Sequence, residues 1–147
     1  MTYSEKKALF EALHVSIAHV GISFDSGKEA SEAANLLSAL LGKDKKEIPG
    51  VSFFVASDIE LTNSRVRGKV GHIGFDTDDL IRTLRALEEE GIKPDYQTAR
   101  LDKDGSLKTV YLKENYFGFG IHFSQRIIKK DLDTQEDCAA SVCIKPL

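Results

Sequence analysis

The sequence predicts an α+β fold built from two similar halves. Three observations support this prediction: stretches in which apolar and polar residues alternate as in half-buried strands, two amphipathic helical stretches, and a short motif that occurs twice. The motif reads HVGI at residues 19–22 and HIGF at residues 72–75. Each copy lies on the first predicted strand of its half and precedes one helix and further strands. We therefore expect two sheet halves related by pseudo-twofold symmetry.

The first half opens with a helix, a strand and a second helix. Residues 3–13 place apolar side chains at helical spacing behind a possible cap at Ser4, which predicts a short helix that docks on the rest of the chain. Alternation over residues 15–24 predicts the first strand. Residues 26–41 combine a serine cap with a stripe of alanines and leucines, and a glycine follows, which predicts a helix with a defined start and end.

Two short strands complete the first half. Residues 43–47 are charged and are predicted as a loop, and a Pro-Gly turn follows them. Residues 51–56 and 59–62 are short apolar runs joined at Ser57-Asp58, as in a hairpin. The predicted order is therefore strand, helix, strand, strand.

The second half repeats this order. An amphipathic stripe follows its first strand, and Gly91 ends that helix. An Asp-Gly turn separates two of the later strands. The predicted elements are strands at residues 70–75, 96–101, 106–112 and 119–124 and a helix at residues 78–90.

Composition and charge predict one domain over residues 1–147. With 41% hydrophobic residues the chain can bury a core, and its formal net charge of −3 gives no basic surplus for binding nucleic acid or an anionic membrane. No apolar run approaches the roughly 18 residues of a membrane helix, and the chain does not begin with a signal peptide, so we expect a cytoplasmic protein. Cys138 and Cys143, in a C-terminal extension at residues 126–147, are expected as reduced thiols.

Four side chains on the predicted strands form a candidate metal site. His19 and His72 occupy the same position in the repeated motif, while Glu60 and His122 lie on the last strand of each half. Their neighbours along the strands are aliphatic or aromatic, so these side chains face away from the apolar side of the sheet. If the helices cover the apolar side, the other side is free to form a concave surface where the four converge. Three imidazoles and one carboxylate suit a divalent transition metal.

A simpler interpretation applies to any one of these residues, since a single strand histidine is more often packed or exposed than bound to a metal. The chain has four histidines, and three of them occupy repeat-related positions on the polar faces of strands. This grouping favours the metal site. His14 has no counterpart in the second half and is predicted to be structural.

These residues resemble the vicinal oxygen chelate superfamily, the group of glyoxalases, bleomycin-resistance proteins and extradiol dioxygenases. The resemblance covers about residues 14–125. It rests on AHVGI at residues 18–22, IELT at 59–62, GHIGF at 71–75 and GIHF at 120–123. Within the superfamily the chain is most similar to the module attached to the C-terminus of some bacterial ketohydroxyglutarate and ketodeoxyphosphogluconate aldolases, through residues 107–113 and 118–122.

The resemblance implies a fold and a ligand set. It implies two tandem β-α-β-β-β modules, at about residues 14–64 and 70–125, that form a cupped mixed sheet with helices on the outer face. It also implies one divalent metal, which could be Zn, Ni, Co, Mn or Fe. The implied ligands are His19, Glu60, His72 and His122. In glyoxalases a glutamate takes the position of His122, so the site here keeps a single carboxylate.

A metal held by these ligands has open positions for two neighbouring oxygens of a substrate, which predicts an enzyme. Bidentate binding of a small oxo or hydroxy acid would polarise the carbonyl and stabilise an enediolate, as in a glyoxalase-like isomerase or lyase. Glu60 is the predicted catalytic proton acceptor, and Glu114 and Tyr116 could also approach. Two non-catalytic alternatives stay open: a small-molecule binding module and an accessory subunit of a 2-oxo-acid aldolase. We expect the chain to form a homodimer. We also expect it to bind a small-molecule substrate.

Overall fold

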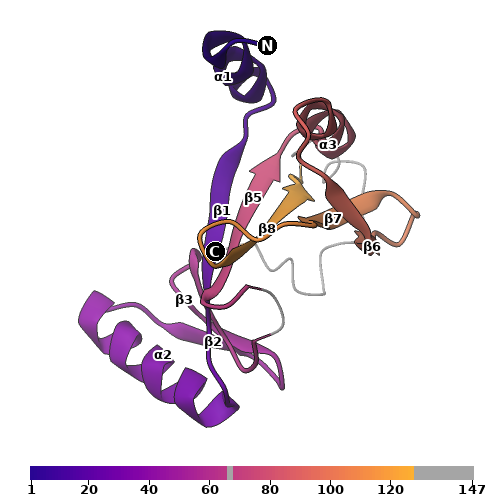
Figure 1. Cartoon of the computed structure of the whole chain (residues 1–147). Helices are drawn as coiled ribbons and strands as arrows, with labels where there is room; N and C mark the ends of the chain where they lie inside the picture. Colours follow the sequence, from indigo (N-terminus) through magenta and orange to yellow (C-terminus); the bar gives the residue numbers. More distant parts are fainter. Residues whose placement is uncertain (66–67, 128–147) are drawn as a thin grey trace, which may run out of the picture.

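The computed structural model describes residues 1–65 and 68–127, and one mixed sheet dominates it (Figure 1). The strand order is β2-β3-β4-β1-β5-β8-β7-β6. The helices are α1 (Tyr3–Ala12), α2 (Gly27–Leu41) and α3 (Leu80–Glu89). The strands are β1 (Ser16–Ser23), β2 (Lys45–Ile48), β3 (Ser52–Val55), β4 (Ile59–Thr62), β5 (Gly71–Thr77), β6 (Pro94–Leu101), β7 (Leu107–Leu112) and β8 (Phe119–Gln125).

The sheet consists of two modules joined at its centre. Module 1 runs β1-α2-β2-β3-β4, and module 2 runs β5-α3-β6-β7-β8. Strands β1 and β5 pair antiparallel in the middle, and each is flanked by the last strand of its own module, β4 or β8, in parallel register. This arrangement confirms the two tandem β-α-β-β-β modules that the resemblance implied. It also brings the two copies of the His-x-Gly motif side by side.

Helix α2 covers the part of the sheet that belongs to module 1. Ser26 caps it by accepting a hydrogen bond from Glu29 N, and Gly42 ends it in the left-handed conformation (φ 59°). Ala30 and Ala34 are fully buried, and their small side chains let the helix approach β3 and β4 closely. The core beneath α2 also contains Phe53, Val55 and Leu61.

Helix α3 covers the corresponding part of module 2. Asp79 caps it by accepting a hydrogen bond from Arg82 N (2.9 Å). The core beneath α3 contains Leu80, Leu84, Leu87, Val110, Leu112, Ile121 and Phe123. Figure 1 shows α2 and α3 at opposite ends of the sheet. Because strand residues alternate between faces, the residues between these core positions project from the face that α2 and α3 leave free.

Two local predictions were wrong. The predicted loop at residues 43–47 contains most of strand β2, which pairs antiparallel with β3 at the edge of the sheet. Its lysines and glutamate are largely exposed, as in many edge strands, so no alternation of apolar residues marks it. The cap of the N-terminal helix is Thr2 instead of Ser4. Thr2 Oγ1 accepts from Glu5 N (3.3 Å), and the Glu5 carboxylate accepts from Thr2 N (2.7 Å).

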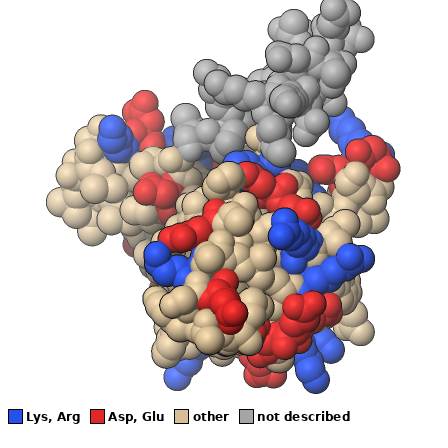
Figure 2. Space-filling model, turned by 90° about the horizontal axis from the view of Figure 1, so that it is seen from above, with Lys and Arg blue, Asp and Glu red and all other residues tan. Residues whose placement is uncertain are grey.

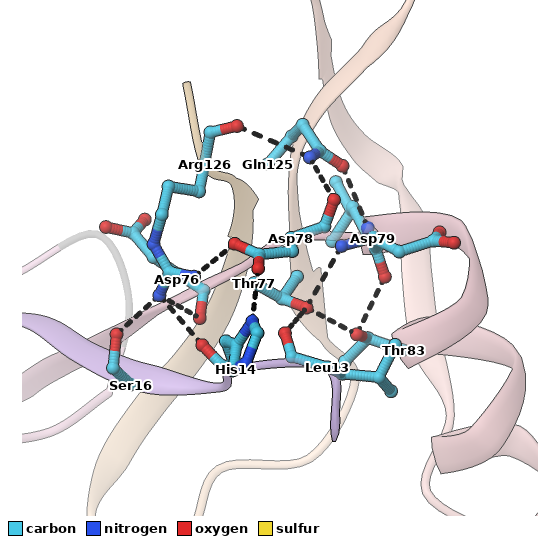
Figure 3. A network of polar contacts seen from close by, with 11 residues as sticks. Leu13, His14, Ser16, Asp76, Thr77, Asp78, Asp79, Thr83, Gln125 and Arg126 are labelled. Atoms are coloured by element: carbon cyan, nitrogen blue, oxygen red, sulfur yellow. Dashed lines mark hydrogen bonds and ion pairs between the residues drawn. The ribbon is translucent and has the colours of Figure 1, made fainter. Parts of the chain in front are cut away.

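A polar network fixes the segment before β1 to the ends of β5 and β8 (Figure 3). Arg126 Nη2 donates to His14 O (2.8 Å) and to Ser16 Oγ (2.6 Å), and Arg126 also forms an ion pair with Asp78. His14 Nδ1 lies 2.5 Å from Asp78 Oδ2, and the His14 side chain is 71% exposed. This histidine therefore belongs to the junction between α1 and the sheet.

The surface agrees with the balanced charge of the sequence. Figure 2 shows basic and acidic side chains interspersed over the face seen from above. Among residues 1–65 and 68–127, no helix is long and apolar enough to cross a membrane. The two cysteines, Cys138 and Cys143, lie outside the described residues.

Candidate metal centre

The four predicted ligand residues lie in two neighbouring rows across the centre of the sheet. The first row contains Glu60, Gly21 and His72 on β4, β1 and β5. The second row contains His19, Gly74 and His122 on β1, β5 and β8. Leu61 and Phe123 follow two of these residues and belong to the cores beneath the helices. The predicted ligand residues therefore project from the other face of the sheet, which we call the cup.

Donor atoms of the four side chains converge in the cup. His19 Nε2 lies 2.9 Å from His72 Nε2 and 3.2 Å from His122 Nε2. Glu60 Oε2 lies 3.0 Å from His72 Nε2 and 3.4 Å from His19 Nε2. A single N–H on His19 could point at only one of its three neighbours. Hydrogen bonds alone therefore leave several of these donor atoms without a good partner.

The spacing fits the coordination of one divalent metal. Bonds of about 2.0–2.2 Å to nitrogen and oxygen place neighbouring ligand atoms roughly 2.9–3.5 Å apart in a tetrahedral or octahedral shell. The four separations of 2.9, 3.0, 3.2 and 3.4 Å fall within that range. The three histidines by themselves offer ligand atoms that all lie within 4.8 Å of one another. Imidazoles and a carboxylate are donors that zinc and similar divalent metals accept.

Burial favours the neutral form of His19 and His122. The side chains of His72 and His122 are almost inaccessible, with 6% of each residue exposed. Burial, reinforced by repulsion from His19 and His72, lowers the pKa of His122 to about 3. Burial also lowers the pKa of His19, although the Glu60 carboxylate opposes this shift. Neutral imidazoles are the form that binds a metal.

Glu60 supplies the negative charge of the group. Burial raises its pKa, but the hydrogen bond with His72 and the electrostatic influence of His72, His19 and the nearby Ser52 hydroxyl outweigh burial, so the pKa of Glu60 lies below its ordinary value. Its side chain is 13% exposed. With three neutral imidazoles, a divalent metal in this shell would leave a net charge of about +1.

Two hydroxyl groups, those of Ser124 and Thr109, orient the ring of His122. Its Nδ1 atom lies 3.4 Å from Ser124 Oγ, which lies 3.0 Å from Thr109 Oγ1. A hydrogen bond at Nδ1 fixes the orientation of an imidazole and leaves the Nε2 lone pair free. Nε2 is the atom that lies 3.2 Å from His19 Nε2.

Aromatic rings stand beside the donors on both sides. Phe54 contacts His19 edge-on, with ring centroids 5.8 Å apart, and the centroid of Tyr111 lies 5.0 Å from that of His122. Both rings lie directly across from ligand residues in the strand register. Neither ring was among the predicted site residues, although alternation along their strands places both on the cup face.

The structure adds a second carboxylate to the cup. Asp76 lies on the cup face of β5 as the register partner of Ser124. It is half-buried, and within the described part of the chain its carboxylate forms no hydrogen bond or ion pair. Burial raises the pKa of Asp76 above its ordinary value, against the opposing charges of Arg126 and His19. The predicted strand ended one residue before Asp76, so the alternation was not extended to it.

Arg100 brings a positive charge to the same face. It is the register partner of Thr109, whose hydroxyl lies on the cup side. Arg100 is exposed, and its charge helps to lower the pKa of His122. A cation at this place was not predicted, because the register between β6 and β7 is irregular there.

The two other groups that the sequence suggested near the site lie elsewhere. Glu114 is an exposed residue of the segment between β7 and β8. Tyr116 packs against the core beneath α3, which is on the helix side of the sheet. Tyr116 therefore does not face the four converging donors, and among the described residues no hydrogen bond or ion pair joins Glu114 to them.

Comparison with solved structures identifies the fold. Methylmalonyl-CoA epimerase from Mycobacterium tuberculosis matches with a TM-score of 0.51 and 17% identity, over 79% of this chain and 91% of that chain. The Streptomyces coelicolor methylmalonyl-CoA epimerase in complex with 2-nitronate-propionyl-CoA matches with a TM-score of 0.51 and 18% identity, over 75% and 93%. A hypothetical protein from Bacillus halodurans matches with a TM-score of 0.53 and 16% identity, over 78% and 96%.

No protein-family model matches the sequence, and no curated protein matches it. The similarity to the solved structures therefore concerns the fold. It agrees with the sheet order, in which two modules meet at β1 and β5 and curve around a polar face. The chain has the vicinal oxygen chelate fold that its sequence resemblance implied.

Proposed function

We propose that the protein is a glyoxalase-like isomerase that binds one divalent transition metal. The proposed ligands are His19, Glu60, His72 and His122. The observation that carries the proposal is the convergence of their donor atoms: each lies 2.9–3.4 Å from at least one other, and those of the three histidines all lie within 4.8 Å of one another. Methylmalonyl-CoA epimerases share the fold and are isomerases by name, which supports the same class of reaction here.

The substrate is a small oxo or hydroxy acid. When bound, the metal supplies a Lewis acid for two neighbouring oxygens of the substrate and makes the adjacent C–H bond more acidic. Arg100 gives the cup a cation for the carboxylate of such an acid, since guanidinium groups bind carboxylates with two hydrogen bonds. The exposure of Arg100 leaves this group accessible to a ligand.

Asp76 accepts the proton that leaves the substrate. A general base must be free of other partners and must have a pKa close to the working pH. Among the described residues the Asp76 carboxylate has no hydrogen bond or ion pair, whereas Glu60 Oε2 lies 3.0 Å from His72 Nε2. Burial also raises the pKa of Asp76, whereas the pKa of Glu60 is lowered. Glu60, the catalytic residue expected from the sequence, then serves as a ligand.

The chain forms a homodimer through the outer face of β1. Ile17 and Ile22 lie on the helix side of the sheet between α2 and α3, and they are 65% and 36% exposed. Burial of such apolar side chains stabilises association. Light scattering after size exclusion should give a dimer for the wild type and a monomer for Ile17→Lys. A wild-type monomer would contradict the dimer.

Metal analysis combined with proton exchange tests the function. Protein purified without chelators should contain about one divalent metal per chain. In D₂O it should exchange a C–H proton of at least one probe from a panel of 2-oxo acids, 2-hydroxy acids and methylmalonyl-CoA, as followed by NMR. Exchange without fragmentation indicates an isomerase, and fragmentation indicates a lyase.

Two histidine variants provide the control. His72→Ala should lose both the metal and the exchange, because it removes a ring nitrogen that lies 2.9 Å from His19 Nε2 and 3.0 Å from Glu60 Oε2. His14→Ala removes an exposed histidine outside the cup and should keep both. Absence of metal uptake by the wild type, or equal uptake by His72→Ala, would contradict the proposal.

A further inference from the structure

Each row of the candidate metal centre has a glycine at its middle. Gly21 stands between Glu60 and His72, and Gly74 stands between His19 and His122. The two glycines occupy equivalent places in the His-x-Gly motifs. Glycine in the middle of a strand is unfavourable, because it has no side chain to pack and loses more backbone entropy than other residues. Its presence at both positions therefore needs a physical reason.

Backbone conformation does not supply this reason. Glycine is often required where φ is positive, as at Gly42 and Gly91 in this chain. Neither Gly21 nor Gly74 has a positive φ. Gly21 pairs in regular register with β4 and β5, and Gly74 pairs with His122 of β8 and with His19 of β1, next to a shift in the register between β1 and β5. An alanine would therefore fit the backbone at either position.

The reason is the space that the imidazole rings occupy. A Cβ atom on Gly21 would lie 2.1 Å from Cε1, 2.3 Å from Nδ1 and 2.6 Å from Nε2 of His72. A Cβ atom on Gly74 would lie 2.6 Å from Cε1 and 2.7 Å from Nε2 of His122, and 2.8 Å from Cε1 of His19. All of these distances are shorter than any real contact of a Cβ atom, so the rings would have to move.

We infer that Gly21 and Gly74 are positioning residues of the metal centre: each leaves open the place in which the rings of neighbouring strands lie over the sheet. Gly21 of module 1 makes room for His72 of module 2. Gly74 makes room for His122 of its own module and for His19 of module 1. The rings lie over the backbone of these glycines and so bring their donor atoms together from three strands.

The expected effect on metal binding rests on the proposed function. The space that the glycines leave for the rings rests on the contacts alone. Gly21→Ala and Gly74→Ala should weaken metal binding about 10- to 100-fold, as is typical when a group that orients a ligand is lost. Neither variant removes a ligand atom. Gly27→Ala is the matched control, because its Cβ would lie 3.3 Å from the Asn63 side chain and touch no histidine.

Double variants of the metal-free protein test the structural part. Urea unfolding with a chelator present should give a lower midpoint for Gly21→Ala than for the wild type. The same substitution should have little effect in a His72→Ala background, because the clashing ring is gone. It should keep its full effect in a His122→Ala background. Gly74→Ala should keep its full effect in a His72→Ala background. It should recover only in part with His122→Ala, because its Cβ would also lie 2.8 Å from Cε1 of His19.

The outcomes separate the inference from the proposed function. If Gly21→Ala fails to fold, recovery of folding in the double variant with His72→Ala supports the inference. Equal effects of Gly21→Ala in all three backgrounds would overturn it, as would unchanged metal affinity in both glycine variants. If the wild type binds no metal, the proposed function fails, and the unfolding cycle still decides whether the glycines make room for the rings.

Discussion

Acid should destabilise the metal-free protein because the buried imidazole of His122 resists protonation. The ordinary pKa of a histidine is about 6.5, and the pKa of folded His122 is about 3. Between these two values the unfolded chain binds a proton that the folded chain does not bind. The free energy of unfolding therefore decreases as the pH falls below 6.5, and it continues to decrease until the pH reaches about 3.

The size of the effect follows from the two pKa values. Lowering the pH from 7 to 5 should reduce the free energy of unfolding by about 2 kcal/mol through His122 alone. The result depends almost entirely on the unfolded pKa, since pH 5 lies well above the folded one. The lowered pKa values of His19 and Glu60 add losses of the same sign on acidification, and the raised pKa of Asp76 acts in the opposite direction.

Urea unfolding at pH 7, 6 and 5 measures this effect. The experiment compares the wild type with His122→Gln, in the presence of a chelator, by circular dichroism. Glutamine keeps a polar side chain but does not titrate, so the wild type should lose about 2 kcal/mol more than the variant between pH 7 and pH 5. Equal losses in the two proteins would mean that folded His122 accepts a proton readily, which would refute the buried neutral site.

Three further predictions concern single side chains. Leu61→Ala should reduce the free energy of unfolding by about 2–5 kcal/mol, because Leu61 is fully buried beneath α2, whereas Leu40→Ala at a 71% exposed position should change it by less than about 0.5 kcal/mol in urea titrations. Thr83→Val should cost about 1–3 kcal/mol by the same measurement, because it removes a buried hydroxyl that lies 2.8 Å from Thr77 Oγ1; an unchanged midpoint would contradict this reasoning. Asp76→Asn should leave metal affinity within about threefold in a competition titration, since its carboxylate is not among the converging donors, and a much larger loss would make it a ligand.

The sequence was sufficient for most of the fold because the local signals agree with one another. Alternation placed β1 and β5, and the caps at Ser26 and Gly42 placed α2 to within a residue. Strand β2 was not predicted, because its edge position leaves its charged side chains in solvent and its sequence therefore shows no alternation of apolar and polar residues. Edge strands of this kind can be recognised only from the neighbour with which they pair.

The site was partly predictable for a related reason. Parity along a strand shows which face a side chain occupies, and this was enough to group His19 with His72 on the polar face. It does not show which residues lie opposite each other on neighbouring strands, because register depends on the whole sheet. The roles of Gly21, Gly74 and Asp76 therefore came from the structure.

The most direct test of the account is X-ray absorption on the zinc-loaded protein. The account predicts one zinc ion per chain, with nitrogen and oxygen ligands at about 2.0–2.1 Å and the multiple-scattering signal of three imidazoles. In His122→Ala the signal should fall to two imidazoles. Two results would contradict the claim that these side chains hold a single metal. One is zinc binding that does not saturate at one ion per chain, and the other is an imidazole signal that is unchanged in His122→Ala.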